Sequence, residues 1–206
     1  YDAPKLKEAV SIVLDTYNLS YGNEGRLSEF QFRSIVQTLR GIYAGGPNTL
    51  AIVGGTGSGK SYGFQLGAVI AIVEQRLAGT LSSVHSLFLY PRVALMADQR
   101  EALEGLLDLI NIHHLSGIEI RWASDGGSFL KTIDYPRLVN PDIEPEDLEK
   151  KGIREVIRSI YADPLKCPHL VFANPDTLTY RLADPIANQF LTNNLKNLVV
   201  DEIHLL

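Results

Sequence analysis

Residues 50–61 read LAIVGGTGSGKS, and this stretch decides the fold. Four apolar residues come first, and residues 54–61 then fit the pattern G-x-x-x-x-G-K-[ST]. Apolar residues recur through residues 64–73, which predicts a helix directly after the loop. Glycines in such a loop let successive backbone N–H groups face phosphate oxygens, and the helix N-terminus adds its dipole. The sequence therefore predicts a strand, a phosphate-binding loop and a helix, in that order.

Short apolar runs alternate with longer helical stretches along the rest of the chain. Several of these runs lack polar residues at alternate positions, as parallel strands buried on both faces do. The expected strands are residues 50–53, 87–90, 118–122, 170–173 and 198–200. Strand–helix–strand units of this kind predict an α/β fold with a doubly wound, mostly parallel sheet. Such sheets bind their ligands at the carboxyl ends of the strands.

Two helices are expected before the loop. Asp2 is a candidate N-cap for the first, with Pro4 in its first turn and apolar residues at helical spacing as far as Tyr17. Residues 28–31 read SEFQ, which matches a capping box at the start of the second. We expect an N-terminal helix and linker over residues 1–26 and the main domain over residues 27–206. An insertion at about residues 124–168 is longer than an ordinary connection and carries its own helix.

Composition limits the classes of protein that fit. The 206 residues are 45% hydrophobic, enough for one α/β domain with a sizeable core. A net charge of −5 argues against a surface that is basic throughout, but a protein that grips phosphates with backbone amides needs no basic average. The single cysteine, Cys167, excludes an intrachain disulfide. With no apolar run of membrane-spanning length and no secretory signal pattern, we expect a cytoplasmic protein without a membrane partner.

The last expected strand runs into Asp201-Glu202-Ile203-His204. Asp201 and Glu202 therefore follow the carboxyl end of a strand, where this kind of sheet presents its ligand. Asp201 would hold Mg²⁺ through its water shell, because Mg²⁺ dehydrates reluctantly. Glu202 would orient or deprotonate an attacking water. The alternative is an ordinary acidic strand end, which the phosphate loop in the same chain disfavours.

GSGKS at residues 57–61 and VVDEIH at residues 199–204 together resemble motifs I and II of superfamily 2 helicases, in their DExH branch. YPRVALMADQ at residues 90–99 resembles motif Ia, and FANPDTL at residues 172–178 resembles the later motif written T-P-x-x-L. LSEFQ at residues 27–31 resembles the upstream glutamine motif that reads adenine. The resemblance implies a RecA-like P-loop NTPase domain of an ATP hydrolase that nucleic acid stimulates, with ATP and Mg²⁺ as cofactors.

The resemblance also implies roles for individual residues. Lys60 would reach the β- and γ-phosphates, Ser61 and Asp201 would hold Mg²⁺, and His204 would couple the nucleotide site to the polynucleotide. The catalytic set is then Lys60, Asp201, Glu202 and His204. The nucleotide-binding set is Gln31, Gly55, Thr56, Gly57, Ser58, Gly59, Lys60 and Ser61. Gln31 would bind N6 and N7 of adenine, but a capping box with Ser28 explains this glutamine equally well.

Nucleic acid is expected to bind at two further strand ends. The implied contacts are Arg92, Asn174, Asp176 and Thr177. Arg92 and the first amides of the helix behind it would contact phosphate, although a solvated cation at a strand end is the alternative. Asn174 stands where the family commonly has Thr, which weakens that part of the resemblance. We expect binding without sequence preference, to DNA in preference to RNA.

Superfamily 2 motors have two RecA-like domains, and the second supplies arginines that stabilise charge on the transferring phosphoryl group. No motif follows His204, so we expect a first domain truncated after the DExH motif, with the second domain and protein partners outside these residues. The leading function is a helicase or translocase that couples ATP hydrolysis to movement on, or unwinding of, DNA or RNA. The alternative is an ATP-dependent switch or scaffold without unwinding, for example in a restriction or antiphage-defence complex.

Overall fold

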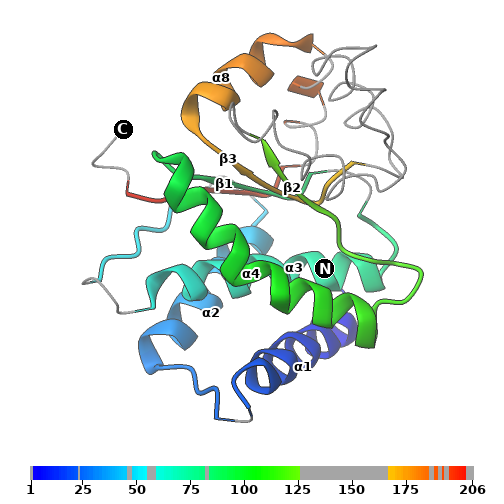
Figure 1. The fold of residues 1–206 in the computed structure, drawn as a ribbon. Helices are drawn as coiled ribbons and strands as arrows, with labels where there is room; N and C mark the ends of the chain where they lie inside the picture. The colour runs from blue at the N-terminus through cyan, green and yellow to red at the C-terminus, as the bar shows by residue number, and fades with distance from the viewer. Residues whose placement is uncertain are drawn as a thin grey trace. The chain divides into compact units, whose positions relative to one another are not determined.

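The computed structural model describes residues 2–22, 24–45, 48–54, 59–81, 84–125, 167–185, 188–189, 192 and 195–202. The chain divides into two compact units, Tyr1–Leu81 with Glu101–Ile120, and Ser82–Arg100 with Arg121–Leu206. Helix α4 (Val93–His114) contributes to both units. The other helices of the first unit and the strands of the second can be followed in Figure 1. Among the described residues, no helix is long and apolar enough to cross a membrane.

The first unit is built around helix α3 (Lys60–Leu77). Helices α1 (Ala3–Ser20) and α2 (Glu29–Tyr43) both pack against it (Figure 1). Every residue of α3 from Gly63 to Glu74 is buried, which explains why its sequence is apolar on nearly all faces. The helix predicted after the loop is therefore confirmed, and it is the core of its unit.

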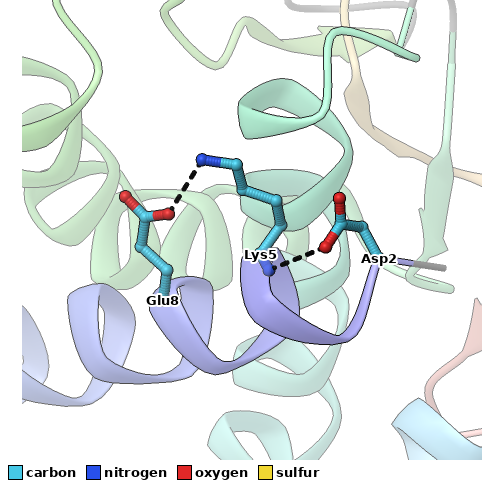
Figure 2. Close-up of polar contacts among 3 residues, drawn as sticks. All are labelled: Asp2, Lys5 and Glu8. Carbon is cyan, nitrogen blue, oxygen red and sulfur yellow. Dashed lines mark hydrogen bonds and ion pairs between the residues drawn. The ribbon is translucent and has the colours of Figure 1, made fainter.

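The start of α1 confirms the predicted N-cap. The Oδ1 atom of Asp2 accepts a hydrogen bond from the Lys5 backbone N–H at 3.2 Å, as Figure 2 shows. One turn on, the Lys5 ammonium pairs with the Glu8 carboxylate at 3.1 Å. The cap satisfies one of the first-turn amides that a helix leaves without a partner. The exposed ion pair adds little to stability by comparison.

Glu74 connects all three helices from a buried position. Its side chain is 2% exposed. One carboxylate oxygen accepts from the backbone N–H of Asp2 at 2.8 Å, and the other accepts from the Tyr43 hydroxyl at 3.0 Å. These bonds satisfy a buried carboxylate that would otherwise be costly. They also fix the first residues of α1 and the end of α2 against the last turns of α3.

Two glycines allow α2 to approach α3 closely. A Cβ atom at Gly63 would lie 2.7 Å from the Ser34 Cβ, and one at Gly67 would lie 2.8 Å from the Thr38 Cβ. No real side-chain carbon tolerates such distances, so the two helices can pack this way only with glycine at both positions. Ser34 and Thr38 are themselves buried in this contact.

The second unit contains a parallel four-stranded sheet, with strands in the order β2-β3-β1-β4. The strands are β1 (Ser86–Leu89), β2 (Trp122–Asp125), β3 (Leu170–Ala173) and β4 (Asn197–Val200). Fully buried β1 and β3 lie side by side and place Phe88 edge-on to Phe172 at 5.6 Å. The predicted α/β class with a parallel sheet is confirmed.

Two strand predictions were wrong. Residues 50–53 form no strand of the described sheet, and Leu50 and Val53 are 44% and 85% exposed. An apolar run becomes a strand only where a neighbour takes its amides, and the run itself does not supply that neighbour. Residues 118–121 are not strand either, because Asn111 bonds both the N–H and the carbonyl of Ile120, at 2.7 and 2.9 Å. At Ile120 a side chain takes the place of a neighbouring strand, and β2 begins at Trp122.

A buried histidine marks the amino edge of the sheet, just before β1. His85 is 0% exposed, and its Nδ1 atom hydrogen-bonds the Ser86 hydroxyl at 2.8 Å. Its backbone continues the ladder, because the N–H of His85 bonds the His169 carbonyl and the N–H of Lys196 bonds the His85 carbonyl. Burial lowers the pKa of His85 to about 4, and the nearby Lys196 charge adds to the effect. The imidazole is therefore neutral near pH 7.

Candidate functional site

The predicted phosphate loop lies in the first unit, and its two ends are described. Gly54 precedes the loop and Gly59, Lys60 and Ser61 follow it, whereas Gly55, Thr56, Gly57 and Ser58 lie outside the described residues. The Lys60 ammonium donates to the Gly54 carbonyl across the loop, at 2.8 Å. This contact brings the two ends of the loop together. It also places the cation at the loop, where a phosphate group would be received.

The beginning of α3 has the geometry of an anion-binding helix end. Its N-cap, Gly59, has a left-handed backbone with φ of 74° and contributes no side-chain cap. A helix leaves its first amides without intrahelical carbonyl partners, and their dipoles favour negative charge. Lys60 and Ser61 occupy this first turn. The residue types and the backbone therefore fit a phosphate group.

Gln31 holds the same helix end from the side of α2. Its Oε1 accepts from the Ser28 N–H at 2.8 Å while its own backbone N–H bonds the Ser28 hydroxyl at 3.2 Å. The predicted capping box is thus confirmed. The Nε2 atom donates to the Gly59 carbonyl at 3.4 Å, and a Cβ at Gly59 would overlap it. Adenine recognition by Gln31 stays a prediction, but this side chain already touches the end of the phosphate loop.

An aromatic cluster beside the loop was not predicted. Tyr62 follows Ser61, and its hydroxyl accepts a hydrogen bond from the Tyr21 hydroxyl at 2.8 Å. Tyr17, 7% exposed, packs against both rings, with centroids 5.0 Å from Tyr21 and 5.6 Å from Tyr62. The sequence offered only one signal, the helical spacing of Tyr17 and Tyr21. Nothing local links either residue to Tyr62, which is 41 positions beyond Tyr21.

Asp201 and Glu202 follow β4 at the carboxyl edge of the sheet, in the second unit. The Asp201 N–H bonds the Leu89 carbonyl at 3.0 Å, so the predicted location at a strand end is confirmed. Its Oδ1 atom accepts from the Glu202 N–H at 2.9 Å. Glu202 is exposed and has a positive φ of 48°, which turns the chain away from the strand direction. His204 lies outside the described residues.

The same edge carries the predicted nucleic-acid residues. Leu89 and Ala173 are register partners at the ends of β1 and β3, and the Tyr90 N–H bonds the Ala173 carbonyl at 3.0 Å. The segments that contain Arg92 and Asn174 therefore start from neighbouring strand ends. Helices α4 and α8 (Pro175–Ala183) begin directly behind them. Two helix N-termini and an exposed arginine thus lie along one edge of the sheet.

Asn174 has a structural task at this edge. Its Oδ1 atom caps α8 by accepting from the Thr177 N–H at 2.8 Å. Thr177 is 8% exposed, whereas Asp176 and Arg92 are exposed. Exposure leaves Arg92 and Asp176 accessible to a ligand, and the role of all four residues in nucleic-acid contact stays a prediction.

The predicted Mg²⁺ ligands belong to different units, Ser61 to the first and Asp201 to the second. The described part of the chain brings no three His, Cys, Asp or Glu side chains together as a metal cage. A hydroxyl, a single carboxylate and water are still an oxygen donor set of the kind Mg²⁺ prefers.

Comparison with known families gives a match to a family model. A model described as DEAD/DEAH box helicase matches residues 28–206. The match begins at the N-cap of α2 and takes in all the quoted motifs from Ser28 on, whereas α1 precedes it. No curated protein and no solved structure matched the chain.

Proposed function

Because the chain belongs to the DEAD/DEAH box helicase family, we propose that it couples ATP hydrolysis to movement on, or unwinding of, DNA or RNA. Domains of this family are RecA-like P-loop ATPases that act on nucleic acid. One observation in the chain supports the proposal above the others. Gly59, Lys60 and Ser61 form an uncapped helix N-terminus behind a loop that the Lys60 ammonium closes.

ATP binding falls to residues of the first unit in this proposal. The first-turn amides of α3 and the residues Gly55 to Ser58 would surround the phosphates. Lys60 would exchange its bond to the Gly54 carbonyl for the β- and γ-phosphates, since a charged acceptor makes the stronger hydrogen bond. Gln31 would contact the adenine. Its Oε1 atom would either keep its capping-box bond to the Ser28 N–H or give up that bond.

Hydrolysis falls to the residues after β4. Ser61 and Asp201 would hold Mg²⁺, which neutralises charge on the phosphates when bound. Glu202 would orient the attacking water and take its proton. Its exposed carboxylate is accessible to that water. His204 would couple this step to the polynucleotide. Within the family, VVDEIH resembles the DExH branch.

Nucleic acid would follow the carboxyl edge that carries Arg92 and the starts of α4 and α8. Backbone amides and one cation grip phosphates and do not read base edges. This favours a protein that moves along a strand irrespective of its sequence. The alternative function, an ATP-dependent switch without unwinding, uses the same nucleotide residues and predicts hydrolysis that no strand accelerates.

The test compares Glu202→Gln with the wild type. We expect ATP binding to be retained and hydrolysis to fall about 100-fold or more, because the shape survives and the base is lost. Binding is measured at equilibrium, and hydrolysis with and without unrelated single strands of DNA and RNA. Glu101→Gln is the matched control, since it makes the same change at an exposed site on α4.

Equal losses of ATP binding and of ATP turnover in Glu202→Gln would refute the proposal that Glu202 acts in hydrolysis and not in ATP binding. Wild-type hydrolysis that rises with added strands supports the motor. Hydrolysis that stays constant with every strand supports the switch.

A further inference from the structure

Helix α1 precedes the part of the chain that matches the family, yet it runs the length of α3. Near its start, the Asp2 N–H bonds Glu74 in the last turns of α3. Beyond its end, the Tyr21 hydroxyl bonds Tyr62 in the first turn of α3. The two contacts are 12 residues apart on α3, from Tyr62 to Glu74, and α1 packs against α3 (Figure 1). This element therefore reaches the phosphate-loop end of the helix.

Packing of aromatic rings supports the contact between Tyr21 and Tyr62. Tyr17 is buried beneath it, with its ring edge-on to Tyr62 at 5.6 Å, and the Tyr21 and Tyr62 centroids are 6.4 Å apart. Burial raises the pKa of Tyr62. The Tyr62 hydroxyl is therefore protonated near neutral pH. Packed aromatic rings also restrict the motion of the residues that carry them.

Tyr21 is 47% exposed, and contacts at the end of α1 hold its backbone. Its N–H bonds the carbonyls of Asn18 and Leu19 as the C-cap. The chain then turns back over the helix end, and a Cβ at Gly25 would lie 3.1 Å from the Tyr21 Cβ. The close passage of Gly25 confines the backbone on which the Tyr21 ring is carried.

Tyr62 is the residue after Ser61 and lies in the same turn of α3 as Lys60 and Ser61. Gln31 holds the preceding residue, Gly59, from α2. The first turn of α3 is thus fixed on two sides, by Gln31 at Gly59 and by Tyr21 at Tyr62. A helix end that is already in place loses less freedom when it binds an anion than one that must be ordered.

We propose that Tyr21 is a positioning residue for nucleotide binding, whose hydroxyl holds Tyr62 and so orients the first turn of α3 toward the triphosphate. This inference rests on the proposed function of Lys60 and Ser61. It gives α1, which lies outside the matched family domain, a part in setting ATP affinity. It requires no contact between Tyr21 and the nucleotide.

The experiment is a mutant cycle of Tyr21→Phe, Tyr62→Phe and the double variant, which all keep the rings. Equilibrium dissociation constants are measured for ATP and for inorganic tripolyphosphate, together with melting temperatures. Each single variant is expected to bind both ligands about threefold to tenfold more weakly, the range that one lost hydrogen bond allows. The double variant is expected to be no weaker than the singles, because the same bond is removed.

Tyr43→Phe is the matched control. It removes a tyrosine hydroxyl bonded to the same helix at Glu74, far from Ser61. It is expected to lower the melting temperature and leave both dissociation constants unchanged.

Unchanged affinities in the Tyr21 and Tyr62 variants would overturn the proposal, and so would an equal loss in Tyr43→Phe, which would indicate general destabilisation. A loss for ATP but not for tripolyphosphate would mean that the tyrosines contact the nucleoside, which also overturns it. Lys60→Ala separates this inference from the proposed function. ATP binding that is undiminished in Lys60→Ala would overturn both the proposed function and the positioning role. Loss of ATP binding in Lys60→Ala, together with unchanged affinities in the tyrosine variants, would overturn only the positioning role.

Discussion

Glu202 combines an exposed carboxylate with a left-handed backbone, at φ of 48°. A residue with a Cβ loses about 1 kcal/mol or more in this conformation. The bond from its N–H to Asp201 Oδ1 offsets part of that cost. Strained residues persist where the surroundings impose them, and functional sites are where they gather. The backbone thus singles out the residue that the motif resemblance assigns as the base.

Gln31 is the residue at which two interpretations make separable predictions. Gln31→Ala is expected to lower stability by about 1 kcal/mol through loss of the capping box. If the side chain also reads adenine, the preference for ATP over GTP falls as well. Nucleotide competition and chemical denaturation on the same variant measure the two effects.

Ser28→Ala is the control for Gln31. It removes the hydroxyl half of the capping box and leaves the Gln31 amide beside Gly59. An equal change of nucleotide preference in Ser28→Ala and Gln31→Ala would contradict direct recognition by Gln31.

At the scale of elements, the contact between α2 and α3 holds the helix that begins at Lys60. Gly63→Ala is expected to destabilise the protein by about 1–3 kcal/mol, because the new methyl group meets the Ser34 Cβ at 2.7 Å. Gly105→Ala in α4 is the control, since a Cβ there meets nothing within 4 Å. It is expected to stabilise by about 0.5–1 kcal/mol from helix propensity. Denaturant midpoints that move in the same direction for both would refute the packing argument.

The capping box could be predicted from sequence because Ser28 and Gln31 are three residues apart and need no other element. The close approach of Gly63 to Ser34 could not, since it depends on how two helices cross. Residues 118–121 were misassigned for a related reason. Their apolar alternation is that of a strand, but the amide of Asn111, on another element, takes the bonds of Ile120. Contacts between residues close in sequence were predictable, and contacts between residues on different elements were not.

His85 makes the sheet unit sensitive to acid. Its pKa falls from an ordinary 6.5 to about 4 in the folded chain, so the unfolded chain binds its proton first. The stability it contributes is complete above pH 6.5 and is lost as pH falls toward 4. Between pH 7.5 and 4.5 this loss amounts to about 2–3 kcal/mol. Urea unfolding at both values checks it.

His85→Gln provides the comparison, because it keeps a polar side chain beside Ser86 without a titrating ring. The variant is expected to show a drop in stability between the two pH values that is smaller by the same amount. An identical drop in both proteins would exclude His85 as the cause.

At the scale of the whole molecule, the motifs were predictive where the strand assignment was not. The family match over residues 28–206 accounts for the resemblance that residues 57–61 and 199–204 carried. The DExH branch, and the distinction between unwinding and translocation, remain proposals. Motif residues would be constrained by the ligand that we propose they hold, so they stand out in sequence. Strand pairing at residues 50–53 depends on the rest of the fold, so it does not stand out in the sequence.

Nucleic-acid binding tests the carboxyl edge of the sheet as one surface. Arg92→Ala is expected to weaken binding to all single strands alike and to reduce the slope of log K against log salt by about one. Equilibrium binding to several unrelated strands over a salt series measures both. Arg33→Ala, an exposed arginine on α2 paired with Glu29, is the control. An unchanged slope in Arg92→Ala would remove this residue from the surface.

The central claim is that the first turn of α3 and the loop before it bind the phosphates of ATP. The most direct measurement is equilibrium ATP binding by Lys60→Ala, with Lys7→Ala on exposed α1 surface as the control. Lys60→Ala is expected to weaken binding by about 10-fold to 100-fold, as loss of a charge-assisted bond to phosphate implies, while Lys7→Ala binds like the wild type. Binding by Lys60→Ala that equals the wild type would contradict the assignment.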